Sequence, residues 1–207
     1  IPDFVEYVGP QLDDNKWSKP WTNPFAEEDR RPLVLVGFST TFQNHAGILQ
    51  RVVDALGQLP VRAVVTLGGA IRSDEVAGTT NTVVVHSAPH NELMPQASLV
   101  ITHGGHGTLT KALVHELPML VIPHGRDQMD NAVRVTHRGA GLSLASDADV
   151  ETLRAAIARL LEEPVFAANA AAFGRRIRQE AATCQVEHVL AELARSRAGR
   201  LPSAQAC

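Results

Sequence analysis

Six short runs of apolar residues recur along the chain and constrain its fold more than any other feature. They occupy residues 32–38, 61–68, 81–88, 97–104, 118–125 and 140–144. Short runs without a polar face are typical of strands buried on both sides, as in a parallel sheet covered by helices. The sequence therefore predicts an α/β protein.

Segments with helical spacing of apolar residues alternate with these runs. Residues 46–59 are one such segment, and residues 107–116 and 126–139 are two more. A helix that joins two parallel strands makes a right-handed crossover, and repeated crossovers place helices on both faces of the sheet. The expected fold class is a Rossmann-like, doubly wound parallel sheet with additional C-terminal helices.

Two regions flank the expected Rossmann-like domain, which spans residues 32–164. Residues 1–31 are expected to be a linker, because residues 9–31 are rich in proline and charge and show no apolar period. Residues 165–207 are expected to form C-terminal helices that pack on the domain, followed by a tail.

The chain has a helical pattern from residue 147 onward. Asp147 or Asp149 is suited to cap the first helix, and Pro164 to stop it. A second block, residues 165–197, is expected to turn an apolar stripe toward the core and three arginines toward solvent. The stripe consists of Phe166, Phe173, Ile177, Val186, Val189, Leu190 and Leu193, and the arginines are Arg175, Arg176 and Arg178.

Composition excludes several classes of function. The formal net charge of -3 and a pI near 6.3 argue against a nucleic-acid partner. The two cysteines, Cys184 and Cys207, are too few for a disulfide framework or a cysteine metal site, which favours a cytoplasmic location. No apolar run reaches the roughly 18 residues of a membrane span. The chain starts at Ile1 without methionine, so we expect a piece of a longer protein.

The stretch "VITHGGHGTLTKAL", residues 100–113, places glycines and histidines where a strand turns into a helix. Glycine lets the backbone approach a ligand closely, and a helix N-terminus attracts anions. A phosphate or diphosphate is the expected guest, although neither a Walker loop nor a GxGxxG fingerprint is present. Two other interpretations stay open: a tight turn with incidental histidines, and a metal pair of His103 and His106, which lacks a carboxylate third ligand.

One unit later, "PHGRDQMDN", residues 123–131, again joins a strand end to a helix start. Asp127 and Gln128 are expected to face the same crevice as the glycine turn. A carboxylate next to an amide is suited to sugar hydroxyls, because the carboxylate accepts hydrogen bonds and the amide both donates and accepts them. A phosphate site beside a sugar site indicates a nucleotide sugar.

These motifs resemble the C-terminal, donor-binding domain of GT-B glycosyltransferases, in the family of plant secondary-metabolite and bacterial macrolide or antibiotic glycosyltransferases. The resemblance runs from "FVEYVGP" near the start through residues 87–132 to the last strand. It rests on the order Ala-Pro-His, His-Gly-Gly-x-Gly-Thr, Leu-Pro and Asp-Gln.

The resemblance implies a role for each matching residue. It implies that His103 lies beside the donor diphosphate and that Asp127 and Gln128 hold the sugar. The diphosphate cradle would be completed by backbone amides and a hydroxyl at Gly105, His106, Gly107, Thr108 and Thr40. Ala88 matches the position whose backbone pairs with the nucleobase, His90 a polar position near the ribose, and His124 follows a strand end at the sugar pocket.

Four positions depart from the family pattern. Ser87 replaces the aromatic residue that stacks on the base, which leaves the choice between UDP and dTDP open. Lys111 replaces a glutamate that accepts bonds from ribose hydroxyls, and it is either a solvated helix lysine or a ligand contact. Ser39 and Glu116 replace two glycines. The remaining histidines, His45, His86, His115, His137 and His188, are expected to be surface or packing residues.

The function implied by the resemblance is metal-independent, inverting sugar transfer from a UDP or dTDP sugar to a small lipophilic acceptor, in the biosynthesis of an antibiotic or another secondary metabolite. No cofactor is implied. The general base and the acceptor site would lie in an N-terminal domain outside this chain, so the chain is expected to bind donor without transferring sugar. Two alternatives are a non-catalytic nucleotide-sugar-binding module and a nucleotide-sugar epimerase.

Overall fold

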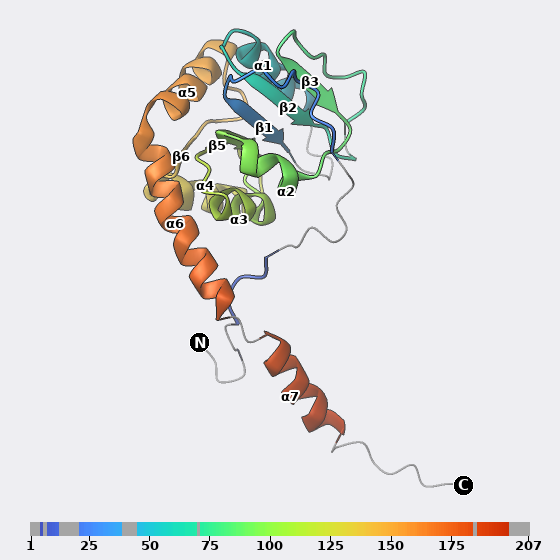
Figure 1. Cartoon of the computed structure of the whole chain (residues 1–207), viewed down its shortest axis with the longest axis vertical. Coiled ribbons are helices and arrows are strands. Elements are labelled where there is room, and N and C mark those ends of the chain that lie inside the picture. The colour runs from blue at the N-terminus through green and yellow to red at the C-terminus, as the bar shows by residue number, and fades with distance from the viewer. Residues whose placement is uncertain are drawn as a thin grey trace, which may run out of the picture.

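The computed structural model describes residues 5, 8–12, 21–38, 45–69, 71–183 and 186–198. Its centre is a six-stranded sheet in the order β3-β2-β1-β4-β5-β6, with every neighbouring pair parallel (Figure 1). The strands are β1 (Leu33–Gly37), β2 (Arg62–Thr66), β3 (Thr82–Val85), β4 (Leu99–Thr102), β5 (Met119–Val121) and β6 (Gly141–Ser143). The predicted Rossmann-like fold is confirmed, and the strand order reverses direction between β1 and β4.

Helices cover both faces of the sheet. They are α1 (Ala46–Gly57), α2 (His90–Leu93), the 3₁₀ turn η1 (Met94–Gln96), α3 (His106–Val114), α4 (Gln128–His137), α5 (Val150–Glu162), α6 (Pro164–Ala182) and α7 (Val186–Ala198). Alternate residues of β1 enter different cores: Val34 and Val36 pack with α1 and α5, whereas Leu33 and Leu35 pack with α3 and α4. The lack of a polar face in each apolar run is thereby explained.

The N-terminal region contributes to one of these cores. Trp21 and Phe25, from the expected linker, pack against the cluster that contains α3 and α4. The guanidinium of Arg62 lies 5.8 Å from the centre of the Phe25 ring. Residues 21–31 therefore lie along the domain surface where the strands begin.

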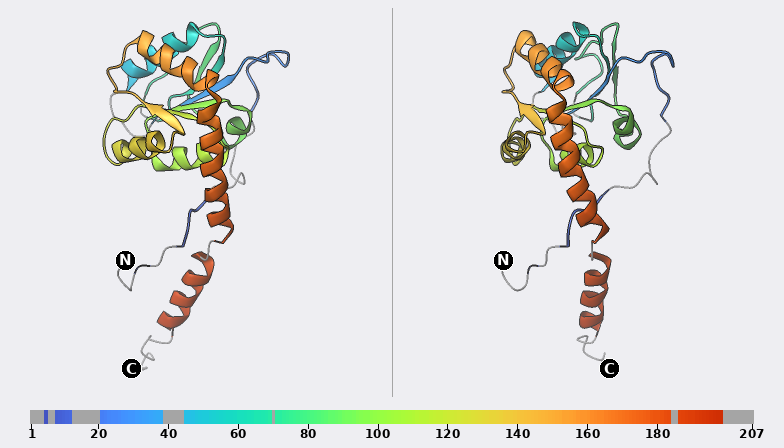
Figure 2. Two further views of the ribbon diagram at one scale, coloured as in Figure 1. Left: turned by 90° about the vertical axis from the view of Figure 1, so that its left-hand side faces the viewer. Right: turned by 60° about the vertical axis from the view of Figure 1, so that its left-hand side comes forward.

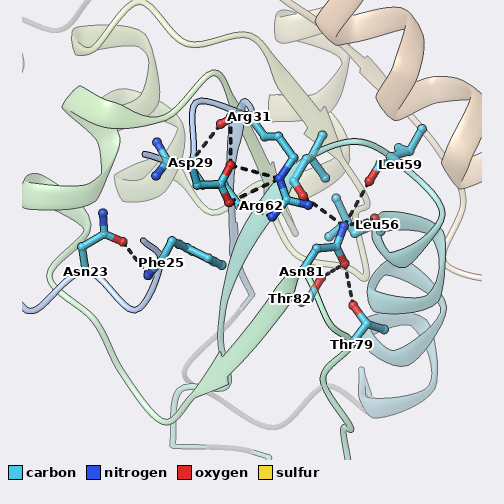
Figure 3. Close-up of polar contacts among 11 residues, drawn as sticks. Asn23, Phe25, Asp29, Arg31, Leu56, Leu59, Arg62, Thr79, Asn81 and Thr82 are labelled. Carbon is cyan, nitrogen blue, oxygen red and sulfur yellow. Dashed lines mark hydrogen bonds and ion pairs between the residues drawn. The ribbon is translucent and has the colours of Figure 1, made fainter. Parts of the chain in front are cut away.

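Polar contacts join the segments at the amino ends of the strands (Figure 3). Asn81 is 5% exposed, and its Nδ2 donates to the carbonyls of Leu56, Leu59 and Val61 at 2.9, 3.1 and 3.0 Å. Nearby, the Arg31 guanidinium pairs with Asp29, and its hydrogen bonds lower the pKa of that carboxyl to about 2.

The helix signals near residue 150 are confirmed in part. Asp149 caps α5, because its Oδ1 accepts a hydrogen bond from the Thr152 amide at 2.7 Å. Pro164 both follows the end of α5 and occupies the first turn of α6, where a proline is compatible with the helix. Among the described residues, no helix combines the length and apolar character that a bilayer crossing requires.

The expected core-facing stripe is confirmed on α6 and wrong on α7. Phe166 is 6% exposed, whereas Leu190 and Leu193 are 59% and 56% exposed. Figures 1 and 2 show α6 leading away from the sheet and α7 continuing beyond the domain. The expectation that all C-terminal helices pack on the domain is therefore corrected for α7. Helical spacing predicts that a face needs a partner, but it does not say where that partner lies.

The expectation that Arg178 is merely solvated is also wrong. Its guanidinium donates to the Val114 carbonyl and pairs with Glu116 at the end of α3. Glu116 stands where the family pattern has glycine and adopts a φ of 62°, which side chains rarely adopt. The backbone of α6 passes so close to α3 that a Cβ on Gly174 would overlap the Leu113 carbonyl. Thus α6 fixes the end of α3 that is remote from the glycine turn.

Candidate donor-binding site

The candidate site lies at the carboxyl ends of β1, β4 and β5, where the strand order reverses. Ligands of open parallel sheets bind at such a point, because the loops from neighbouring strands diverge there. Two of its turns are described, β4 to α3 and β5 to α4. Thr40 and Ser39, in the loop after β1, lie outside the described residues.

The glycines of the first turn fall into two kinds. Gly104 has a φ of 95°, and a Cβ there would lie 2.9 Å from Val121 Cγ1. A Cβ on Gly105 would lie 2.6 Å from His103 Nε2. These two glycines are therefore required by the protein's own packing. Gly107 is different, because a Cβ there would meet no atom within 4 Å. Its glycine leaves open space beside the first turn of α3.

His103 lies beneath this turn and is 9% exposed. Burial, together with the neighbouring His45, lowers the pKa of His103 to about 4, although a hydrogen bond to the Gly37 backbone opposes the shift. The imidazole is therefore neutral near pH 7. A neutral imidazole offers one N–H donor and one acceptor, so His103 is suited to hydrogen bonding and carries no fixed charge. The other cradle positions are more accessible: His106 and Gly107 are exposed, and Thr108 is partly buried.

Three imidazoles surround Phe38 at this end of the sheet; we refer to Phe38, His45, His103 and His124 as the Phe38 cluster. The centre of the Phe38 ring lies 5.7 Å from that of His45, 6.4 Å from that of His103 and 5.7 Å from that of His124. His45 is 1% exposed, so its expected packing role is confirmed. Among the described residues, no group of three or more histidines, cysteines or carboxylates is arranged to hold a metal ion.

His124 connects the Phe38 cluster to the second turn. Its Nδ1 lies 2.9 Å from the Ile122 carbonyl oxygen, and burial lowers its pKa. Its Nε2 is buried and has no hydrogen-bond partner among the described residues. The predicted contact of His124 with a sugar stays a prediction.

Asp127 and Gln128 differ from the expectation that both face the crevice. Asp127 is exposed, with its Oδ2 accepting a hydrogen bond from Asn131 at 2.8 Å. Gln128 is only 2% exposed, and its Oε1 accepts from the amides of His124 and Gly125 at 2.7 and 3.2 Å. The Gln128 carbonyl therefore braces the turn itself. Sequence spacing could not reveal this, because the direction of the side chain depends on the fold of the turn.

Asn131 is a site residue that the sequence did not reveal. It is 4% exposed, and its Nδ2 donates both to the Gly104 carbonyl at 3.0 Å and to Asp127 Oδ2. This amide links the two turns and orients the exposed carboxylate. The sequence feature that could have indicated Asn131 is its position four residues after Asp127, one helical turn along α4.

The residues expected at the nucleoside differ in their exposure to solvent. His90 is mostly buried, with its Nε2 3.2 Å from Thr66 Oγ1 and its ring so close to β1 that a Cβ on Gly37 would lie 2.7 Å from it. Burial, with a smaller contribution from the Lys111 charge, lowers the pKa of His90 to about 4. His90 thus anchors α2 to the sheet, and its expected place near the ribose stays a prediction. Ser87 is exposed, and Ala88 packs partly against the core.

Lys111 lies in a groove of about 580 Å³ that continues from the glycine turn along α3. Its lining residues come from α3, from His115 directly after it, from Asn91 in α2 and from the N-terminal segment Pro10–Leu12. The volume is within the range of small-molecule sites. Of the two interpretations of Lys111, a position in this groove favours a ligand contact.

The fold and the site together define a Rossmann-like domain of the kind that forms one half of GT-B glycosyltransferases. The chain belongs to the family described as "Erythromycin biosynthesis protein CIII-like, C-terminal domain", which matches residues 50–193. The resemblance in the sequence motifs is therefore confirmed at the level of the family.

Named relatives agree with this assignment. "Aclacinomycin-T 2-deoxy-L-fucose transferase" from Streptomyces galilaeus is 40% identical over 136 residues, 62% of this chain and 29% of that protein. "Aklavinone 7-beta-L-rhodosaminyltransferase" from the same species is 33% identical over 177 residues, 83% of this chain and 40% of that protein. The solved structure "Spinosyn Rhamnosyltransferase SpnG complexed with thymidine diphosphate" has a TM-score of 0.68 and 28% identity, covering 81% of this chain and 48% of that one. The chain spans less than half the length of these three proteins.

Proposed function

We propose that this chain is the donor-binding half of a glycosyltransferase that moves a sugar from a nucleoside diphosphate sugar to a small natural-product acceptor. The observation that carries the proposal is Gly107. Neither its backbone nor its surroundings require glycine, yet a side chain there would project into the space beside the first turn of α3. A ligand that approaches the α3 amides would need that space.

The first turn of α3 supplies the chemistry that a leaving diphosphate requires. Unpaired N–H groups at a helix N-terminus carry about half a positive charge, and they point at any anion bound there. His103 adds a neutral hydrogen-bond donor from below the turn. Such fixed dipoles stabilise the charge that develops as the glycosidic bond to the diphosphate breaks, without a metal ion.

Asp127 is the sugar-binding group that the geometry supports best. Its carboxylate is exposed at the start of α4, and Asn131 holds one of its oxygens through Nδ2. Because the side chain is exposed, its carboxylate can also accept hydrogen bonds from sugar hydroxyls. Gln128 and His124 would support the sugar site through the turn that they hold in place.

Donor binding is tested by calorimetry with UDP and dTDP in the presence and absence of EDTA. We expect binding of at least one nucleotide that is unchanged by EDTA and about tenfold weaker in His103→Ala, since a hydrogen bond to a charged group contributes about 1.5–3 kcal/mol. His137→Ala, an exposed histidine at the far end of α4, is the matched control. Failure of both nucleotides to bind at millimolar concentration would contradict the proposal.

We also propose that sugar transfer requires another domain. The support for this is that the chain covers less than half the length of the relatives named above. We expect no sugar transfer when this chain alone receives a UDP or dTDP sugar and a polyketide acceptor. Turnover at a rate comparable with a two-domain glycosyltransferase would show that the general base lies in this chain. Release of free or inverted sugar from donor alone would instead support the epimerase alternative.

A further inference from the structure

One wall of the groove beside α3 comes from an unexpected part of the chain. Gly107, Thr110, Lys111 and Val114 lie on one face of α3, at the i, i+3, i+4 and i+7 spacing of a helix. The facing wall is formed by Pro10–Leu12, about a hundred residues earlier in the sequence. This segment was expected to be only part of a linker.

The position of Pro10–Leu12 is set by a specific contact. Gly9 has a φ of 83°, and a Cβ there would lie 3.2 Å from the Glu180 carbonyl oxygen near the end of α6. A side chain is disfavoured on both counts. Gln11 Nε2 donates to the Gly9 carbonyl at 3.3 Å, which adds a local bond to the same turn. Figures 1 and 2 show this part of the chain beside the end of α6.

The lining of the groove matches the chemistry of a nucleoside attached to a diphosphate. Among the described residues that line the groove, Lys111 is the only Lys, Arg, Asp or Glu, so this part of the lining brings one positive charge and no carboxylate that would repel phosphate. Leu12 and Val114 offer apolar surface to a flat base. Amides at Gln11 and Asn91 both donate and accept hydrogen bonds, as the edge of a pyrimidine requires.

The groove also has the correct connection to the diphosphate cradle. His106 and Gly107 belong both to the first turn of α3 and to the groove lining. A ligand whose diphosphate binds at that turn can therefore extend into the groove without a break. We infer that Pro10–Leu12 forms one wall of the nucleoside site, with Gln11 and Leu12 in contact with the base. This inference rests on the proposed donor-binding function.

The inference is tested by comparing ligands with and without a nucleoside. Calorimetry on the full chain would use UDP, dTDP and inorganic pyrophosphate. The double variant Gln11→Ala/Leu12→Ala is expected to weaken UDP and dTDP binding by about fivefold or more, the loss of one hydrogen bond and some apolar contact. Pyrophosphate affinity should not change, because the α3 amides are untouched.

One further variant tests the contact that positions Pro10–Leu12, and another serves as its control. Gly9→Ala is expected to reproduce the selective loss, since a side chain at φ 83° displaces the segment from α6. Val5→Ala, exposed and outside the groove lining, is the control and should bind all three ligands as the parent does.

The outcomes distinguish the inference from the function on which it rests. Unchanged nucleotide affinity in both Gln11→Ala/Leu12→Ala and Gly9→Ala would overturn the inference and leave the donor-binding proposal standing. A parallel loss of pyrophosphate binding would also overturn it, because the segment would then act on the whole domain. If the parent chain binds neither nucleotide at millimolar concentration, the donor-binding function fails, and the inference fails with it.

Discussion

The two ends of the sheet are built for different purposes. At the amino end, Asn81 satisfies three backbone carbonyls and Arg31 pairs with Asp29. At the carboxyl end, Gly107 is a glycine that the packing of the protein does not require. The Nε2 atom of His124 is buried there and has no hydrogen-bond partner among the described residues. Buried polar groups in folded proteins are usually paired, so the unpaired His124 Nε2 departs from the rule, and the open space beside Gly107 is a separate feature of the same end of the sheet. The amino end stabilises the domain, and the carboxyl end keeps binding capacity.

Among the single substitutions, one at the amino end should therefore have the largest effect on stability. Asn81→Ala leaves three backbone carbonyls without their side-chain donor, and we expect the free energy of unfolding to fall by roughly 3 kcal/mol. Nucleotide affinity of the folded fraction should be unchanged. Urea unfolding and calorimetry measure the two quantities. Asn23→Ala is the matched control, because Asn23 is exposed and makes a single local bond to the Phe25 amide; an equal loss in both variants would contradict this account.

The carboxyl end should show the reverse behaviour. Gly107→Leu fills the space beside the α3 amides, and we expect nucleotide binding to weaken by more than about tenfold, which corresponds to about 1.4 kcal/mol. Thermal stability should be kept or raised, since leucine favours a helix over glycine by up to about 1 kcal/mol. Gly104→Ala is the contrasting variant, with strain at φ 95° and a contact with Val121 that lower stability as well. Intact binding in Gly107→Leu would remove the main support for the site.

The free energy of unfolding should fall in mild acid because of two histidines near the carboxyl end of the sheet. The pKa values of His103 and His90 are lowered to about 4 in the folded protein, against an ordinary value of 6.5. Between these values the unfolded chain binds more protons, so stability is full above pH 6.5 and declines as the pH falls toward 4. The Asp29 pKa of about 2 means that its ion pair is lost only at lower pH. We expect a decline of about 5 kcal/mol between pH 6.5 and 4, since each imidazole contributes about 2.5 kcal/mol over this range.

Urea unfolding across this pH range measures the decline. His90→Gln should make the dependence on pH shallower, because one of the two imidazoles whose pKa is lowered to about 4 no longer titrates. Asn23→Ala, which removes no titratable group, should leave the slope as it is in the parent chain. A stability that does not change between pH 7 and 4.5 would show that neither imidazole is held neutral by burial.

The sequence predicted the sheet well and the side-chain directions poorly, for a physical reason. Six apolar runs specified six strands because burial on both faces leaves an unambiguous pattern. The short α2 and η1 were not predicted, since four and three residues carry no period. His90 and Gln128 turned inward because of neighbours that the fold brings together, namely Gly37 with Thr66 and the turn at residues 123–125. Local motifs locate a site, but tertiary contacts decide which of its residues face the ligand.

Substitutions at the C-terminal end of α3 are expected to have the smallest effect on stability. They also serve as a control, because this end of the helix is remote from the glycine turn. Glu116 holds a φ of 62° where glycine commonly ends a helix, and the Leu117 amide bonds the Ala112 carbonyl at 2.9 Å. Glu116→Gly relieves the strain of this conformation, worth about 1 kcal/mol. It also removes the pair with Arg178. Both side chains are about two-fifths exposed (41% and 39%), so that pair contributes roughly 0.5–1 kcal/mol.

These opposing terms predict that Glu116→Gly alone changes stability little, whereas in an Arg178→Ala background it stabilises the domain by about 1 kcal/mol. Arg178→Ala alone should destabilise, because the Val114 carbonyl also loses its donor. A double-mutant cycle by urea unfolding gives the coupling. Nucleotide affinity should remain that of the parent in all three variants, since the first turn of α3 keeps its amides. A loss of affinity would mean that the contact with α6 positions the glycine turn through the length of α3, and the stabilising and binding regions of the domain would then be coupled.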